Sequence, residues 1–117
     1  MSKWAVEYAD DFFEEVSRHS ADVQTKIAAL ALLLAEFGPH LGRPKVDTLK
    51  GSRHPNMKEL RFDVDQGVWR VAFVFDPKRK AILLNAGNKA GVGEKRFYRE
   101  LIRVADERFD RHLARQK

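Results

Sequence analysis

The strongest constraint on the fold is a pair of alternating segments in the middle of the chain. Every second residue is apolar in residues 60–64 and again in residues 69–75. This period of two is typical of β-strands that bury one face. A turn made of residues 66–67 would join the two strands into an antiparallel hairpin with one wholly apolar face. In the register that this turn fixes, Asp63 lies directly across from Arg70 on the opposite face.

The segments around this hairpin predict further elements. Residues 4–8 alternate and predict a short first strand, while the continuous apolar run 81–86 predicts a buried strand. Between them, apolar residues at helical spacing, interrupted near Ser20, predict a helical hairpin that ends at residues 38–39, a Gly-Pro pair. A last helix is expected to begin at Glu94. Its apolar stripe consists of Phe97, Leu101, Ala105, Phe109 and Leu113, and its solvent-facing arginines are Arg99, Arg103, Arg108 and Arg111.

This order of elements predicts an α+β fold: a strand, a helical hairpin, a three-stranded antiparallel segment and a C-terminal helix. The 117 residues suffice for one hydrophobic core, so residues 1–117 are expected to form a single domain. Helices are expected on one face of the sheet, which leaves the other face open and basic. Residues 40–57 contain glycines and prolines without periodicity and are predicted to be a long loop.

Composition narrows the partners and the chemistry. Twenty-two Lys and Arg against seventeen Asp and Glu give a net charge of +5, which favours RNA, DNA or an acidic protein as partner. The chain has no cysteine, which excludes disulfides and thiolate chemistry. The longest apolar run, 27–35, is far short of the roughly 20 residues that span a bilayer, and the expected location is the cytoplasm. No carboxylate cluster accompanies His19, His40 or His112 at ligand spacing, so no metal site or cofactor is expected.

Three motifs carry a family resemblance. The stretch LKGSRHPNMKELR at 49–61 resembles a signature of HigB-type toxins in the RelE/ParE superfamily. The segment WRVAF at 69–73 resembles the family strand that follows the hairpin. GNKAG at 87–91, followed by RFY at 96–98, resembles the family's lysine loop and final helix. One departure is that a related Gp49-like branch often has two adjacent lysines where this chain has Lys89 followed by alanine, which leaves a single amine in the loop.

The resemblance implies a RelE-like sheet of the microbial-RNase type and cleavage of messenger RNA in the ribosomal A site. It also implies neutralisation by a HigA-like antitoxin with a helix-turn-helix. Because the chain itself has no recognisable helix-turn-helix, DNA binding is expected only through that antitoxin. Two other functions remain open: a ParE-like gyrase inhibitor without nuclease activity, and an RNA-binding module without catalysis.

Five residues are candidates for catalysis. Cleavage by the RNA 2′-hydroxyl needs a proton acceptor, cations that stabilise the phosphorane, and a proton for the leaving oxygen. Arg61 and Arg70 are expected on the open face, where a guanidinium suits phosphate oxygens, and the resemblance adds Lys89 as a further phosphate-stabilising cation. Tyr98 could exchange a proton, with nearby cations favouring its ionised form, and His54 could act as acid or base.

Each candidate also has an ordinary structural reading. Arg61 is then a solvated strand residue, Arg70 a surface partner of an aspartate, Lys89 plain surface, Tyr98 a core aromatic and His54 a loop residue. Four further cations are expected to bind the RNA backbone without a catalytic role. These are Arg53, Lys58, Lys95 and Arg96.

Overall fold

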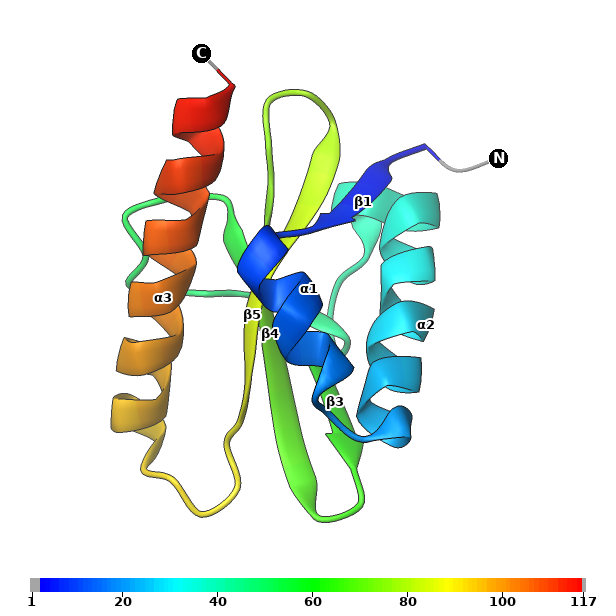
Figure 1. The fold of residues 1–117 in the computed structure, drawn as a ribbon, viewed down its shortest axis with the longest axis vertical. Coiled ribbons are helices and arrows are strands. Elements are labelled where there is room, and N and C mark those ends of the chain that lie inside the picture. The colour runs from blue at the N-terminus through cyan, green and yellow to red at the C-terminus, as the bar shows by residue number, and fades with distance from the viewer. Residues whose placement is uncertain (1–2, 117) are drawn as a thin grey trace.

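The computed structural model describes residues 3–116 and contains a five-stranded sheet flanked by helices (Figure 1). The elements in chain order are β1 (Ala5–Tyr8), α1 (Asp10–Ser17), α2 (Ala21–Phe37), a short 3-10 helix (Gly38–His40), β2 (Val46–Thr48), β3 (Met57–Val64), β4 (Gly67–Phe75), β5 (Lys80–Asn88) and α3 (Glu94–Arg115). The strand order is β1-β5-β4-β3-β2. β1 runs parallel to β5, and the other neighbouring strands are antiparallel. The predicted α+β class and antiparallel segment are confirmed.

Helices cover both faces of the sheet, which corrects the expectation that they share one face. In Figure 1, α2 lies on one side of the sheet and α3 on the other, and α1 crosses in front of β5 between them. One core joins the hairpin to the sheet side that carries Leu60, Val71 and Phe73. A second core joins α3 to the side that carries Met57 and Val74. The open basic face is therefore limited to the strip beside α3, over β2 and β3.

The β3–β4 hairpin has the predicted faces but a different register. Its turn is made of residues 65–66, and Asp65 adopts a positive φ of 53°, a conformation that Asp tolerates better than most residues. The predicted turn at 66–67 is wrong by one position, and the pairing shifts by two. A shift of two keeps each side chain on its face but changes its neighbour. Arg61, and not Asp63, lies opposite Arg70.

The predicted long loop contains a short edge strand and then passes beneath α3. β2 pairs with the first half of β3, and Leu49 enters the core below α3. Ser52 donates a hydrogen bond to the buried Asp106 at 2.5 Å. The following residues, Arg53 and His54, contact Asp110 on the next turn of the helix. Polar contacts of Ser52, Arg53 and His54 thus hold segment 49–56 against α3.

Helix α3 buries the predicted apolar stripe with one correction to its arginines. Arg108 does not face solvent: its side chain is 12% exposed and reaches across to α1 and β5. Its guanidinium donates to both carboxylate oxygens of Glu15, at 2.8 and 2.6 Å, and to the carbonyl of Leu84 at 2.7 Å. No helix within residues 3–116 has the length and hydropathy that a membrane span requires.

Candidate active site

The open strip of the sheet brings four of the predicted catalytic residues to one place. Arg61 on β3 and Arg70 on β4 are direct cross-strand neighbours on the face that α3 covers in part. Lys89 follows β5, and Tyr98 lies in the first turns of α3. All but Arg70 line one groove between α3 and strands β2–β3. Strand parity explains the pair of arginines, whereas the docking of α3 brings in the tyrosine.

Arg70 is buried beneath this groove and forms a network instead of a surface pair. Only 7% of its side chain is exposed. Its Nε donates to the Tyr98 hydroxyl at 3.2 Å and lies 3.6 Å from a carboxylate oxygen of Glu59. Its Nη1 donates to the carbonyl of Trp69 at 2.9 Å. The alternative reading, a surface pair with Asp63, is wrong.

Glu59 is a member of the site that the sequence reasoning missed. It is buried on β3, two residues before Arg61 and on the same face, and accepts a hydrogen bond from the Tyr98 hydroxyl at 2.9 Å. Burial raises the pKa of Glu59, while Tyr98, Arg70 and Arg61 partly oppose that rise. The sequence did contain a signal for Glu59: it is a carboxylate two residues before the candidate Arg61, on the same face of the predicted strand. Glu59 is poised to exchange a proton nearer to neutral pH than an exposed glutamate.

Tyr98 is held in its neutral form, contrary to the expectation that nearby cations favour tyrosinate. Burial raises the pKa of Tyr98, and the hydrogen bond and negative charge of Glu59 raise it further, against the opposing effect of Arg70. The hydroxyl therefore stands between a cation that donates to it and a carboxylate that accepts from it. The Tyr98 hydroxyl thus connects the groove to Glu59 through one hydrogen-bonded line.

Lys89 and Arg61 supply positive charge at the edges of the same groove. The Lys89 ammonium lies 5.5 Å from the centre of the Tyr98 ring, and its backbone N–H donates to the carbonyl of Val68 at 2.7 Å. Its partner is the exposed Glu94, at 3.0 Å. The Arg61 guanidinium lies 3.7 Å from Asp47. Both cations have exposed or half-exposed counter-ions, which an incoming phosphate could replace at little cost.

His54 lies outside this cluster. Its Nε2 is 2.8 Å from Asp110, and its ring meets Phe109 edge-on with centroids 4.7 Å apart. Asp110 is twelve residues beyond Tyr98 on α3, which corresponds to about 18 Å along the helix. His54 thus has the structural role that its alternative reading described, and the structure does not bring it to the other candidates.

The four expected RNA-binding cations are dispersed. Lys95 is exposed and lines the groove with Tyr98. Arg53 is paired with Asp110 beside the histidine. Lys58 lines a separate hollow with His54 and Phe109, and Arg96 lines a separate cleft between α1 and α3. Of these four cations, only Lys95 therefore lies in the groove with the candidate catalytic residues.

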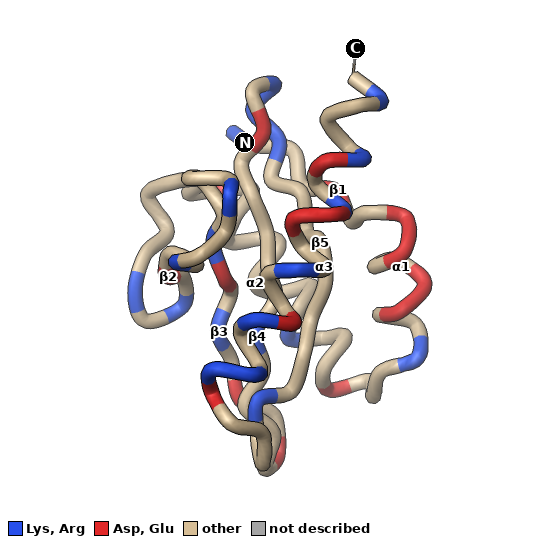
Figure 2. Tube along the Cα trace, turned by 90° about the vertical axis from the view of Figure 1, so that its left-hand side faces the viewer, with Lys and Arg blue, Asp and Glu red and all other residues tan. Residues whose placement is uncertain are grey.

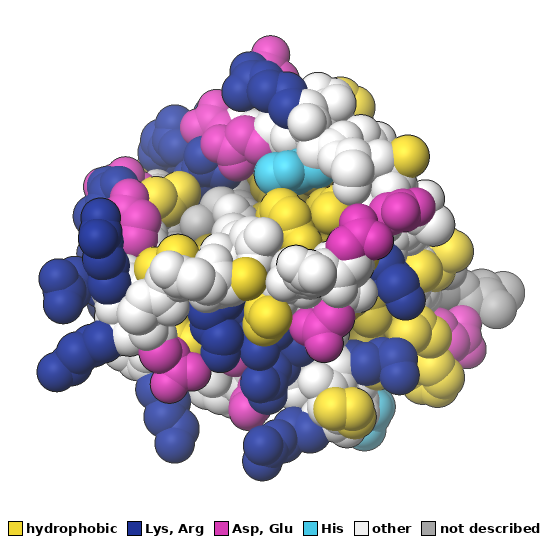
Figure 3. All heavy atoms as spheres, turned by 90° about the horizontal axis from the view of Figure 1, so that it is seen from below, with side chains coloured by type: hydrophobic (Ala, Val, Ile, Leu, Met, Phe, Trp, Pro, Cys, Tyr) yellow, Lys and Arg dark blue, Asp and Glu magenta, His cyan; other side chains and the backbone are white. Residues whose placement is uncertain are grey.

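The charges around the groove are unevenly distributed. Seen from the end that carries the β3–β4 turn, Lys and Arg side chains gather over the centre and the α3 side of the surface (Figure 3). Acidic residues are concentrated on α1 (Figure 2). Within residues 3–116, no three His, Asp or Glu side chains converge in a way that could hold a metal ion. The arrangement provides buried and exposed cations around a carboxylate–phenol pair, which suits chemistry on a phosphodiester.

Comparison with known proteins identifies the family of this chain. The phage-derived Gp49-like family (DUF891) matches residues 14–110. The candidate toxin HigB2 of Mycobacterium tuberculosis is 54% identical over 83 residues, which are 70% of this chain and 41% of HigB2. The candidate toxin HigB3 of the same organism is 44% identical over 93 residues, 80% of this chain and 79% of HigB3. This chain thus spans about two fifths of the length of HigB2.

The fold also matches a solved toxin structure. A mutant of Escherichia coli toxin RelE in the free state superposes with a TM-score of 0.61 at 11% sequence identity, over 92% of this chain and 98% of RelE. This similarity defines the class of protein: an α+β chain with the RelE fold. More particularly, the chain belongs to the Gp49-like family, among the relatives of HigB-type toxins. The predicted family resemblance is confirmed.

Proposed function

We propose that this chain is the toxin of a type II toxin–antitoxin system and that it cleaves messenger RNA on translating ribosomes. The observation that carries the proposal is the Glu59–Tyr98–Arg70 network at the base of a groove flanked by Arg61 and Lys89. A ParE-like inhibitor that only binds gyrase would not need these groups in one place, so their proximity favours the nuclease. The names of the HigB relatives and the RelE fold support the same function.

The proposed reaction is attack of an RNA 2′-oxygen on the adjacent phosphorus. A bond forms between the 2′-oxygen and phosphorus, and the bond from phosphorus to the 5′-oxygen breaks. The products are a 2′,3′-cyclic phosphate and a 5′-hydroxyl. Tyr98 takes the 2′-proton while its own proton passes to Glu59 along their 2.9 Å hydrogen bond. The pair then returns a proton to the departing 5′-oxygen, so it ends in its starting protonation state.

Positive charge on the chain takes the role that a metal ion has in other nucleases. Lys89 and Arg61 flank the groove and are assigned to the phosphate oxygens, where negative charge grows in the transition state. Arg70 lies behind Tyr98 and holds the phenol in place while it adds positive charge from below. The proposed enzyme is accordingly a metal-independent endoribonuclease.

We also propose the partners and the location of the chain. A cognate HigA-like antitoxin with a helix-turn-helix would silence the chain and provide DNA binding. The ribosome and its messenger RNA would be the target, and the cytoplasm is where all of these occur. The net charge of +5 suits both the polyanionic target and an acidic surface on the antitoxin.

Induced expression tests the proposal directly. The wild-type chain, Lys89→Ala and the control Lys78→Ala are induced to equal levels, and the 5′ ends of cellular RNA are mapped soon afterwards. Lys78 is an exposed residue in the β4–β5 turn, away from the groove. The expected result is new 5′ ends inside translated frames for wild type and Lys78→Ala and none for a folded Lys89→Ala. Growth arrest with intact messages would contradict the nuclease and favour gyrase inhibition.

A further inference from the structure

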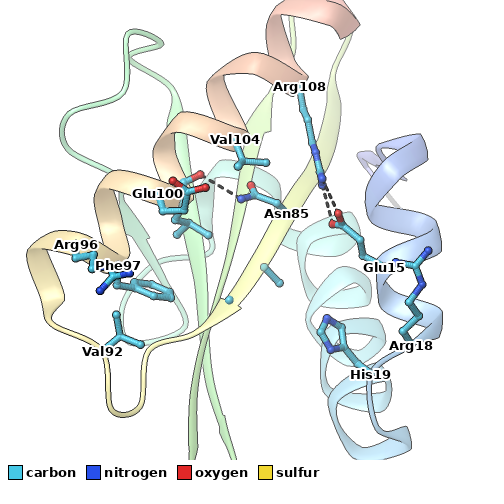
Figure 4. A pocket seen from close by; sticks show the side chains of 13 residues that line it. Glu15, Arg18, His19, Asn85, Val92, Arg96, Phe97, Glu100, Val104 and Arg108 are labelled. Carbon is cyan, nitrogen blue, oxygen red and sulfur yellow. Dashed lines mark hydrogen bonds and ion pairs between the residues drawn. The ribbon is translucent and has the colours of Figure 1, made fainter.

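A second cleft lies on the other side of α3 from the candidate active site, and the proposed chemistry does not use it. It runs between α1 and α3 with β5 at its base (Figure 4). The α3 residues that line it extend from Arg96 to Arg108, about 18 Å of helix. The ion pair of Arg108 with Glu15 closes one end, and Val92 lies at the other (Figure 4). An elongated shape of this kind suits a segment of chain better than a compact small molecule.

The base of this cleft is an unpaired strand edge. β1 pairs with β5 only from Lys80 to Leu83, and the last backbone hydrogen bond on that side runs from the Ala9 N–H to the Leu83 carbonyl at 2.9 Å. β5 continues to Asn88, and its edge over residues 84–88 has no strand beside it among the described residues. Of the backbone groups there, the Leu84 carbonyl already accepts from Arg108. Open strand edges bind extended peptides through main-chain hydrogen bonds.

A buried acceptor in the cleft has no partner. Asn85 is 6% exposed, and its Nδ2 donates to the Leu101 carbonyl at 3.1 Å. Within residues 3–116, its Oδ1 has no hydrogen-bond partner. Buried polar atoms in folded proteins are satisfied in the great majority of cases, because an unpaired one lowers stability. A donor from a bound segment would satisfy it.

The walls and rims of the cleft define the chemistry of that segment. Phe97 and Val104 present apolar surface along α3 (Figure 4). Arg18 and Arg96 stand on the two rims, are exposed, and form no ion pair with any residue between 3 and 116. Two acidic residues, Glu15 and Glu100, also line the cleft, and they are already paired with Arg108 and Arg103. An occupant with apolar side chains toward the cleft and carboxylates toward its rims is complementary to this surface.

We infer that this cleft binds an extended acidic segment of a partner protein, which adds a strand to the open edge of β5. The partner is the antitoxin, so the inference rests on the proposed function. The loop between β5 and α3 connects the two sites: Val92 lines this cleft, and Lys89 lines the active-site groove. A segment bound along β5 would therefore fix the loop that carries the catalytic ammonium without covering the groove itself.

The test uses the adjacent gene product that restores growth on co-expression. It is mixed with the full chain carrying Lys89→Ala, and amide hydrogen exchange is measured by NMR. The expected result is slower exchange, at least tenfold, for amides in residues 84–88. The double substitution Arg18→Glu with Arg96→Glu is expected to weaken binding at least tenfold, whereas Lys26→Glu, an exposed charge reversal on α2, leaves the affinity unchanged.

The outcomes separate this inference from the proposed function. If no neighbouring gene product restores growth, the toxin–antitoxin proposal fails and the inference fails with it. If a neutralising partner binds the Arg18→Glu, Arg96→Glu variant as tightly as Lys26→Glu and leaves exchange at 84–88 unchanged, only the docking site is wrong. Protection of the same amides by a short RNA, without the partner, would assign the cleft to nucleic acid and likewise overturn the inference.

Discussion

At the scale of single residues, the site depends on one carboxylate among several cations. Arg61, Arg70 and Lys89 can stabilise a charged transition state but cannot accept a proton while they stay ionised. Glu59 adds that capacity, and Tyr98 links it to the groove through the bonds on both sides of its hydroxyl. In the proposed reaction, the phenol is the group that touches the substrate, and the glutamate acts through it.

Removing either member of the pair should abolish proton transfer while the fold remains. Glu59→Gln keeps the size and a hydrogen-bond acceptor but takes up no proton, and Tyr98→Phe keeps the ring but loses the hydroxyl. Each is expected to lower the single-turnover rate of message cleavage by about 10²- to 10⁴-fold. Cleavage on programmed ribosomes and thermal melting measure the two properties. If a folded Glu59→Gln cleaves at the wild-type rate, the relay is wrong.

The raised pKa of Glu59 gives the cleavage rate a predictable pH dependence. Glu59 accepts a proton only when it is ionised, so the rate should rise with pH through a pKa above the ordinary value of 4.5. Since burial also raises the pKa of Tyr98 above 10.0, the phenol stays protonated across the neutral range. Single-turnover rates between pH 4.5 and 8 should show this rising limb for wild type. The limb should be absent from the residual rate of Glu59→Gln.

The alternation of a strand is visible in the sequence, so the site residues that it places on one face could be predicted. Site residues that are positioned by long-range contacts could not. Arg61 and Arg70 follow from alternation, which survives an error of two in register. His54 lies away from the other candidates because segment 49–56 packs against α3. That packing joins residues more than fifty positions apart in the sequence. Glu59 was overlooked because, in an alternating pattern, a charged residue reads as solvent-facing until a helix is known to cover it.

At the scale of elements, the unexpected feature is the helix on the second face. The amphipathic pattern of α3 predicts which side of the helix is buried but not which face of the sheet it covers. A signal was present in the sequence of β4, where all residues from Val71 to Val74 are apolar, and the structure buries all of them. A strand that is apolar on both sides needs cover on both sides. The exposed strip over β2 and β3 is therefore what remains of the predicted open face.

Charge substitutions on the two faces of β4 test this layering. Val71 faces the helical hairpin and Val74 faces α3, and each is at most 1% exposed. Both Val71→Asp and Val74→Asp should lower the free energy of unfolding by about 3–5 kcal/mol or prevent folding, because each buries an unpaired carboxylate. Leu32→Asp, at a position 74% exposed on α2, is the control. Urea denaturation that finds Val74→Asp as stable as the control would show that α3 does not pack there.

Hydrogen bonds of Asp76 link the C-terminal end of α3 to the β4–β5 turn. One of its oxygens accepts from the backbone N–H of Lys78 and Lys80, and the other contacts His112 and Gln116 at 3.1 and 2.9 Å. Burial raises the pKa of Asp76, but these hydrogen bonds outweigh burial and lower the pKa overall. The folded state therefore prefers the ionised carboxylate, and its contribution is present above the unfolded pKa and is lost as pH falls through the folded value.

Replacing the Asp76 carboxylate should lower the free energy of unfolding at neutral pH. It should also make that free energy depend less on pH in the acid range. Asp76→Asn is expected to lose about 1–3 kcal/mol in the free energy of unfolding at pH 7. The loss relative to wild type should shrink below about pH 4, where the carboxylate of the unfolded wild-type chain begins to take up a proton. Urea denaturation at pH 7 and pH 3 measures both, with the exposed Asp63→Asn as control. An equal deficit at the two pH values would contradict the sign of the shift.

At the scale of the whole molecule, acidic and basic side chains gather on different surfaces, which the net charge of +5 does not describe. The acidic residues of α1 stand apart from the strip over β2 and β3, where Lys and Arg dominate (Figures 2 and 3). An approaching RNA or acidic protein therefore meets an oriented field and not a uniform positive surface. Exposed charges separated by more than about 8 Å are screened at physiological salt, so this orientation acts mainly on the encounter.

The rate at which the proposed antitoxin binds the chain should depend on salt. If acidic segments of the partner meet exposed cations such as Arg18 and Arg96, long-range attraction should speed association, while the apolar contacts of the bound state hold the complex. Raising salt from 50 to 500 mM should then lower the association rate constant about tenfold or more and change the dissociation rate much less. Stopped-flow mixing and surface-based dissociation measure the two rates, with sucrose at matched viscosity as the control for diffusion. An association rate that does not respond to salt would refute electrostatic steering, even if the complex itself proves tight.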